Sequence, residues 1–233
     1  MPKAFDSWQV SPHRPIEKLE PNLWRVEGDL PSGNGTRVMT IVKLKSGGLL
    51  IHNAIALEEE VMKEIESFGT PEILVVPSGF HRLDAKVYKD RYPKLKVLSP
   101  AGSKKKVEQV VKVDDVYTGT IDDTVSVTHL DGMKEHEGVM LVEHDGNKTL
   151  VFNDCINNLP PISGVMGFML SPTGMPAVPR ITRWFILKDA KSFRGQLEKL
   201  ASTPGLSRII VSHGAPMTDK PGDVLKTVAS RLS

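Results

Sequence analysis

The chain has 233 residues, of which 39% are hydrophobic and 25% are charged. This length and composition indicate a globular protein with room for one large domain or two small ones. The formal net charge of +2 is too small to indicate nucleic acid as a partner. No apolar run approaches the roughly 18 residues of a membrane span, so we expect no membrane partner either.

The cysteine count and the N-terminal residues bear on the cellular compartment. Cys155 is the only cysteine, which excludes an intrachain disulfide and is consistent with a reducing environment. The N-terminal sequence MPKAFDSWQVSPHRP lacks the apolar core of a signal peptide. We therefore expect a cytoplasmic protein.

In chain order, residues 1–21 are rich in proline and polar side chains and are predicted to form an N-terminal arm, followed by one domain over residues 22–233. The next segments alternate apolar and polar residues or form a short apolar run, and both patterns predict strands. These strands are expected at Leu23–Glu27, Arg37–Leu44 and Leu49–Asn53. Helical spacing of apolar residues, with glutamates in the first turn, predicts a helix over Leu57–Phe68.

The apolar run Glu72–Val76 predicts a buried strand that stops at Pro77 and is followed by a polar turn. A rigid strand end of this kind is suited to hold functional side chains. Further helices are predicted at Asp84–Tyr92, Ser103–Val110, Asp189–Ala201 and Asp223–Leu232. Further strands are predicted at Leu95–Leu98, Thr124–His129, Val139–Glu143, Thr149–Phe152 and Arg208–Val211.

The segment Leu159–Pro179 is unusual, because it is rich in proline, glycine and methionine and carries no charge before Arg180. We predict that it is not a regular helix and that it packs over the domain as a loop. Two interpretations stay open, a lid on a pocket and a buried irregular connection. The order of the predicted elements fits two sheets sandwiched between helices better than a single parallel sheet.

Three polar residues follow strands or lie close to one: His136, Asp154 and His213. Two imidazoles and one carboxylate can form the ligand set of a divalent metal, and this set suits zinc or non-haem iron. The three residues are far apart in the sequence, so no local motif places them together. Scattered surface or hydrogen-bonded histidines are the alternative interpretation.

Four segments, taken in order, resemble the metallo-β-lactamase superfamily: LLIHNAIAL, EILVVPSGFHRLD, KEHEGVMLVEHDGNKTLVFNDC and IIVSHG. The resemblance covers roughly residues 23–232 and implies an αββα sandwich, a four-layer fold with its site at one edge between the two sheets. In this comparison His136 resembles the histidine that opens the middle hairpin of the family. Asp154 resembles its bridging aspartate, and His213 resembles its final histidine.

The chain departs from the family at the main ligand motif, His-x-His-x-Asp-His, which should follow Val76. Pro77 and Gly79 stand in place of the two leading histidines, His81 in place of the aspartate, and Arg82 in place of the last histidine. The chain therefore resembles a divergent branch with a degenerate metal-ligand motif. A standard two-zinc site would lose most of its ligands, and the activation of water by the family's hydrolases depends on them.

Several nearby residues have two interpretations each. His81 is either a fourth ligand or a cap of the turn. The fixed charge of Arg82 could replace a cation and pair with Asp154. His52 at a strand end is interpreted as a core histidine. Cys155 is either a soft ligand or nucleophile, or a small buried hydrophobic residue.

These observations support three hypotheses. The first is a hydrolase with one divalent metal, zinc or iron, in which His136, Asp154 and His213 are ligands and His81 assists. The second is a non-catalytic descendant of the fold without metal, in which Arg82 and the Leu159–Pro179 segment bind a small anionic molecule or a partner. The third is a mononuclear iron oxygenase that uses the same two histidines and one carboxylate.

Overall fold

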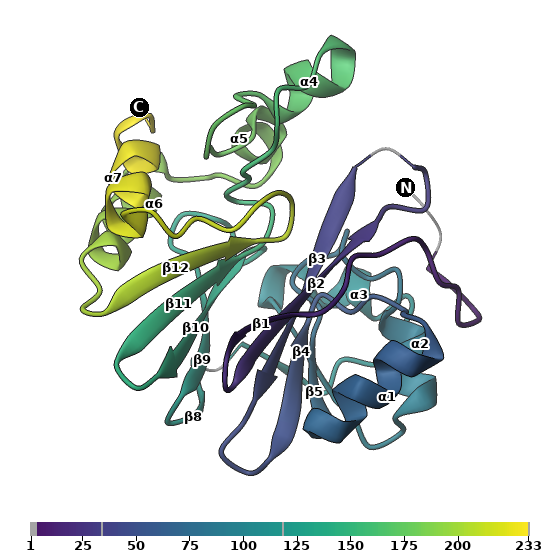
Figure 1. The fold of residues 1–233 in the computed structure, drawn as a ribbon. Helices are drawn as coiled ribbons and strands as arrows, with labels where there is room; N and C mark the ends of the chain where they lie inside the picture. The colour runs from purple at the N-terminus through teal and green to yellow at the C-terminus, as the bar shows by residue number, and fades with distance from the viewer. Residues whose placement is uncertain (1–3, 34, 118, 233) are drawn as a thin grey trace. The chain divides into compact units, whose positions relative to one another are not determined.

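The computed structural model describes residues 4–33, 35–117 and 119–232. Within it the chain forms two compact units, residues 1–124 (the N-terminal unit) and residues 125–233 (the C-terminal unit) (Figure 1). Each unit has a sheet, helices and a hydrophobic core of its own. No helix among the described residues is both long and apolar enough to cross a membrane.

The N-terminal unit is built on a seven-stranded sheet with the strand order β1-β2-β3-β4-β5-β6-β7. Neighbouring strands are antiparallel from β1 to β4 and parallel from β4 to β7. The strands are β1 (Glu17–Glu20), β2 (Leu23–Asp29), β3 (Thr36–Lys43), β4 (Gly48–His52), β5 (Thr70–Val75), β6 (Lys96–Ser99) and β7 (Asp115–Val116). Strand β8 (Gly119–Asp122) follows, shortly before the boundary of the unit.

The helices of this unit fill the crossovers between its parallel strands, as a parallel sheet requires. They are α1 (Glu59–Phe68), α2 (Ala85–Arg91), the 3-10 helix η1 (Ala101–Ser103) and α3 (Lys104–Val107). Met62 and Ile65 of α1 and Tyr88 of α2 are fully buried in the core that the sheet and the helices share. The site-bearing turn at residues 77–84 joins β5 to α2, so it starts from a strand with buried neighbours on both sides.

In the C-terminal unit the strands β9 to β12 form a sheet in the order β12-β11-β10-β9. They are β9 (Val125–His129), β10 (Gly138–His144), β11 (Asn147–Phe152) and β12 (Leu206–Val211). Strands β10 and β11 form a hairpin around Asp145 and Gly146, whose φ values of 46° and 80° suit a tight two-residue turn. Strand β12 then pairs parallel with β11, which brings the ends of these two strands to the same edge.

Four helices complete this unit: α4 (Gly164–Leu170), α5 (Arg180–Phe185), α6 (Ala190–Ala201) and α7 (Pro221–Ser230). Helices α6 and α7 contact each other and supply Phe193, Leu197 and Leu225 to the core. Helix α4 stands away from the sheet of its own unit (Figure 1). Helices α6 and α7 therefore cover the core of this unit, and α4 contacts α5.

The structure confirms a mixed fold with two sheets and helices, and it confirms each of the predicted strands and helices, with ends shifted by a few residues. The prediction that the segment Leu159–Pro179 has no regular helix is wrong, because the segment contains α4. Helix α5 begins directly after the segment ends. The predicted arm and single domain stay predictions, although β1 shows that the arm ends in a strand. Residues 1–3 of the arm lie outside the described residues.

Candidate functional site

Asp154 and His213 come together at the edge of the C-terminal sheet. Phe152 at the end of β11 is paired with Val211 at the end of β12, and each functional residue follows its strand end by two positions. Parallel pairing in this register makes the two side chains neighbours. The His213 Nε2 atom lies 3.3 Å from the Asp154 Oδ1 atom, and both side chains are about one-fifth exposed.

The spacing of these two atoms fits a shared metal ion. Two ligands at about 2.0–2.1 Å from zinc in tetrahedral geometry lie roughly 3.3–3.4 Å from each other. A direct hydrogen bond between nitrogen and oxygen is about 2.7–3.2 Å, so the observed 3.3 Å is slightly long for one. A carboxylate and an imidazole are also donor types that zinc and iron accept. These two residues therefore fit a divalent metal, and they supply part of its ligand set.

A buried hydrogen-bonded network lies directly behind this edge of the sheet. The Asn153 Nδ2 group donates to Glu137 Oε1 at 3.1 Å, and the Ser212 hydroxyl donates to Asn153 Oδ1 at 2.9 Å. All three side chains are buried. Each of them is adjacent in sequence to a predicted ligand. Glu137 follows His136, Asn153 precedes Asp154, and Ser212 precedes His213. The network thus ties together the three segments that carry those ligands.

Glu137 is the titratable member of this network. Burial raises the pKa of its carboxyl group well above the usual range, and the negative charge of Asp154 adds to the rise. The hydrogen bond from Asn153 acts in the opposite direction and lowers the pKa. A neutral carboxylic acid can both donate and accept a hydrogen bond, so Glu137 can hold its place in the network without a buried charge.

His136 lies between β9 and β10, and its backbone N–H donates to the Met133 carbonyl at 2.9 Å. Among the described residues, no group of three ligand atoms close enough to hold one metal contains His136. The structure therefore brings Asp154 and His213 together and leaves the role of His136 as a prediction.

In the N-terminal unit, a buried asparagine fixes the ring of His81. The Asn53 Nδ2 group donates to the Val38 carbonyl at 2.8 Å, so its Oδ1 atom is the acceptor that faces His81 Nδ1 at 3.0 Å. His81 Nδ1 must therefore carry the proton of the neutral ring, which makes Nε2 the nitrogen with the lone pair. With this tautomer, Nε2 is the ring nitrogen that can act as a metal ligand or a general base.

His52, at the end of β4, is buried and 4% exposed, as the interpretation as a core histidine predicts. Burial lowers the pKa of His52 to about 3, and the nearby charge of His81 contributes to the shift. Its Nδ1 atom has no hydrogen-bond partner among the described residues. His52 is therefore a neutral ring at physiological pH.

The turn that replaces the family's ligand motif is held by the unit's own side chains. The Ser78 hydroxyl accepts the N–H of Phe80 at 3.2 Å, and Ser78 is buried. The Arg82 guanidinium donates to the Lys106 carbonyl and, at 2.9 Å, to Gln109 Oε1. These contacts join the turn to the end of α3, so Arg82 has a structural role within its own unit.

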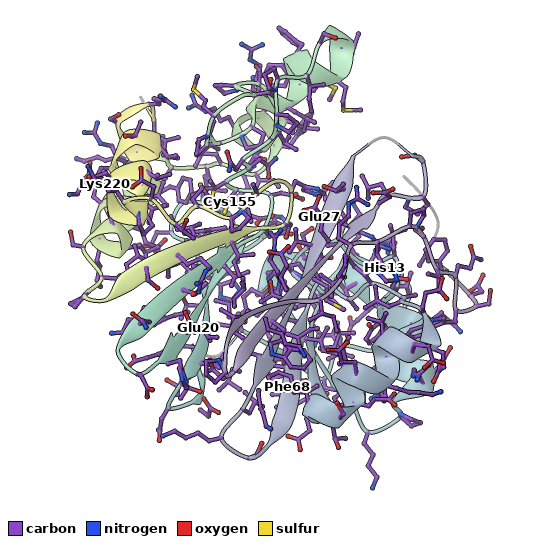
Figure 2. The ribbon with its side chains drawn as sticks, in the orientation of Figure 1. His13, Glu20, Glu27, Phe68, Cys155 and Lys220 are labelled. Atoms are coloured by element: carbon purple, nitrogen blue, oxygen red, sulfur yellow. The ribbon has the colours of Figure 1, made fainter. Side chains whose placement is uncertain are left out.

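Cys155 is fully buried in the core of the C-terminal unit (Figure 2), and burial raises the pKa of its thiol well above the ordinary value. A thiol in this environment is protonated, which agrees with its interpretation as a small hydrophobic residue.

The Thr182 hydroxyl of α5 donates to the Asp154 carbonyl at 2.9 Å. Sequence reasoning missed Thr182, Asn53 and the network, and adjacency to the predicted ligands was the only available signal for the network.

Comparison with known proteins shows similarity at the level of the fold only. No protein-family model matches the chain, and no curated protein matches its sequence. The metallo-β-lactamase DIM-1 shares 14% identity over 97% of this chain and 100% of its own, with a TM-score of 0.65. A metallo-β-lactamase from Hirschia baltica shares 13% identity over 93% of this chain and 97% of its own, with a TM-score of 0.61. The metallo-β-lactamase FIM-1 from Pseudomonas aeruginosa, in a mono-zinc form, shares 12% identity over 95% of this chain and 96% of its own, with a TM-score of 0.62.

Proposed function

Because this chain has the metallo-β-lactamase fold, we propose that it is a metal-dependent hydrolase with a single divalent metal, zinc or iron. The observation that supports this proposal most is the 3.3 Å spacing between Asp154 and His213, which suits two ligands of one ion. The loss of the leading histidines of the family motif, at Pro77 and Gly79, argues for one metal rather than two.

We assign two ligands to Asp154 and His213, which offer a carboxylate oxygen and an imidazole nitrogen 3.3 Å apart, and we include His81 as a candidate further ligand. The tautomer that Asn53 imposes on His81 supports its inclusion, because Nε2 is left with its lone pair. His136 is a further candidate ligand. A metal held there would polarise a bound water or the substrate carbonyl and so assist hydrolysis.

The chain's own side chains have separate tasks in this proposal. Asp154 accepts a proton from the attacking water as well as holding the metal, and His81, where it is not a ligand, accepts this proton at the lone pair of Nε2. Arg82 provides a fixed positive charge for an anionic group of the substrate. Its bonds to Lys106 and Gln109 hold the guanidinium in one orientation, as such a role requires.

Metal analysis of the protein, purified without a histidine tag, tests the proposal. After incubation with zinc, manganese or iron and removal of free metal, we expect about one metal per chain. Asp154→Asn and His213→Gln should lower this occupancy. His144→Gln is the matched control, because His144 lies on the β10–β11 hairpin and its Nε2 atom is 3.5 Å from Asp145 Oδ2.

The same samples are assayed for hydrolysis of ester, thioester and β-lactam substrates, with and without a chelator. Chelator-sensitive hydrolysis that is lost in Asp154→Asn supports the whole proposal. A metal content near zero with all three metals contradicts the metal site. Bound metal without hydrolysis of any substrate contradicts the enzymatic part and favours a non-catalytic descendant of the fold.

A further inference from the structure

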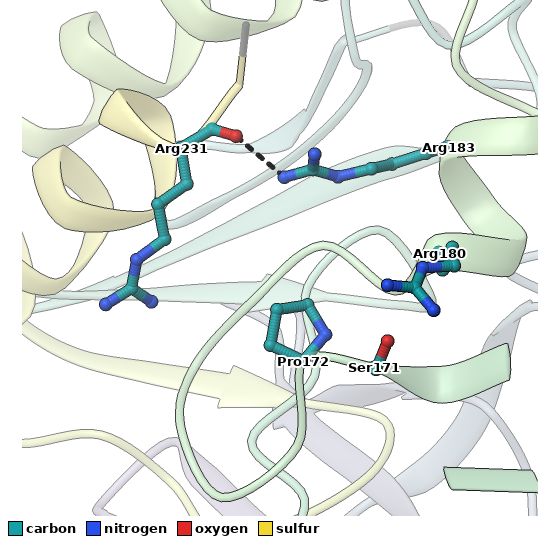
Figure 3. A pocket seen from close by; sticks show the side chains of 5 residues that line it. All are labelled: Ser171, Pro172, Arg180, Arg183 and Arg231. Atoms are coloured by element: carbon teal, nitrogen blue, oxygen red, sulfur yellow. Dashed lines mark hydrogen bonds between the residues drawn. The ribbon is translucent and has the colours of Figure 1, made fainter. Parts of the chain in front are cut away.

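A pocket of about 300 Å³ lies beside α5 in the C-terminal unit, and its lining includes none of the residues assigned above. Its lining consists of Ser171, Pro172, Arg180, Arg183 and Arg231 (Figure 3). Three of these five residues are arginines, which carry a positive charge at every physiological pH. Arg180 and Arg183 are three positions apart in α5, so they lie on one face of the helix.

The contacts of these arginines position their charges without neutralising them. The Arg183 guanidinium donates to the Arg231 carbonyl at 2.8 Å (Figure 3), and Arg180 donates to the Phe168 carbonyl at 3.4 Å. Arg231 donates to the Pro176 carbonyl and to the Met175 sulfur. Within the part of the chain that the structure describes, the salt bridges of this unit involve other side chains. The pocket therefore concentrates positive charge that favours an anion.

An exposed apolar surface adjoins this pocket. Six large apolar residues of α4, α5 and their connection are between 41% and 80% exposed: Val165, Met166, Phe168, Met175, Trp184 and Phe185. The Phe168 and Trp184 rings lie 6.1 Å apart, and the Arg180 guanidinium lies 4.2 Å from the centre of the Phe168 ring. Arg180 thus links the charged pocket to the aromatic surface. Clusters of exposed apolar residues of this size generally mark binding surfaces.

We propose that this pocket binds the anionic head of an amphiphile, a phosphate or a carboxylate, whose apolar chain lies on Phe168 and Trp184. The combination of fixed positive charge and exposed aromatic rings matches the two halves of such a molecule. A second copy of the chain fits less well, because a two-fold symmetric contact through this surface would place arginines of both copies close together. The proposal does not depend on metal binding at Asp154 and His213.

Binding of dodecyl phosphate below its critical micelle concentration tests this assignment. Calorimetry is done in chelator, so that the result is independent of the metal proposal. We expect dodecyl phosphate to bind at least tenfold more tightly than dodecyl maltoside, which has a neutral head, and than inorganic phosphate. Arg180→Gln and Arg231→Gln should each weaken binding at least tenfold. Arg194→Gln is the matched control, because Arg194 is paired with Glu198 on the surface of α6.

Tryptophan fluorescence reports on the apolar part of the surface. Dodecyl phosphate should shift the emission of Trp184 to shorter wavelength, and the shift should be absent in Trp184→Phe, which still binds. Equal binding of dodecyl phosphate and dodecyl maltoside would overturn the proposal, as would unchanged affinity in both arginine variants. Sedimentation with phosphatidylglycerol vesicles but no binding of monomeric dodecyl phosphate would also overturn the pocket and assign the surface to a membrane instead.

Discussion

Asn53 shows how one side chain decides the chemistry of another. Its φ of 60° lies in the left-handed region, which asparagine tolerates better than most residues. In that conformation its amide bridges the Val38 carbonyl and the His81 ring. The sequence marks His81 as a candidate ligand, but the asparagine that fixes its tautomer is 28 positions away along the chain. Only the fold brings the two together.

Replacing Asn53 therefore tests both stability and tautomer. We expect Asn53→Ala to lower the free energy of unfolding by about 2–3 kcal/mol, because a buried carbonyl loses its donor and a left-handed residue gains strain. Asn53→Gly is the matched control, since glycine relieves the strain but not the lost hydrogen bonds. Nitrogen-15 chemical shifts of His81 should show the Nδ1–H form in the native protein only. An unchanged tautomer in both variants would contradict the role of Asn53.

The low pKa of His52 predicts a pH dependence of stability. Its pKa is about 3 in the folded chain, against 6.5 for an ordinary histidine. Below pH 6.5 the unfolded chain therefore binds a proton that the folded chain does not, and stability falls as the pH falls toward 3. The slope is at most about 1.4 kcal/mol per pH unit, or about 2 kcal/mol between pH 6.5 and 5.

Urea unfolding of the native protein and of His52→Leu at pH 7 and pH 5 measures this effect. Both proteins lose stability on acidification through their other groups, so the informative quantity is the difference between them. We expect the native protein to lose about 2 kcal/mol more than His52→Leu. Parallel losses in the two proteins would show that His52 is not the group responsible.

At the scale of elements, the sequence predicts the strands and helices that bury a regular apolar pattern. It misses β1, β7 and β8, because segments of only two to four residues are too short to show a clear alternation of apolar and polar side chains. It also misses α4, where Gly164 and Gly167 and the flanking prolines obscure the helical pattern. Asp154 and His213 were found because both follow apolar strands. That their strands are paired in register is a tertiary fact that no local spacing reveals.

The network of Glu137, Asn153 and Ser212 joins the segments at the ends of β11 and β12 to the start of β10. Removal of one member leaves its buried polar partner without a hydrogen bond, which lowers the free energy of unfolding by about 1–3 kcal/mol. We expect Glu137→Ala and Asn153→Ala to destabilise the protein by this amount each. Because the two residues are bonded to each other, the double variant should be less destabilised than the sum of the single ones by about 1 kcal/mol.

Glu137→Gln is the conservative control, because glutamine keeps an acceptor for Asn153 and should recover most of the lost stability. If the network also positions the ligands, Asn153→Ala should lower zinc affinity about 10- to 100-fold, as measured by competition with a chromophoric chelator. Additive losses in the double variant would contradict a connected network. A zinc affinity equal to that of the native protein would limit its role to stability.

For the whole molecule, metal binding at the proposed ligands should stabilise the folded chain. A metal that binds only the folded chain raises the free energy of unfolding by about 2.7 kcal/mol when its concentration is 100 times the dissociation constant. Zinc should therefore raise the melting temperature of the native protein and of the control His144→Gln. In His213→Gln and in His81→Gln the rise should be much smaller, since each variant lacks one ligand. A full rise in His81→Gln would remove His81 from the ligand set and favour His136 as the second imidazole, which the same measurement on His136→Gln would decide.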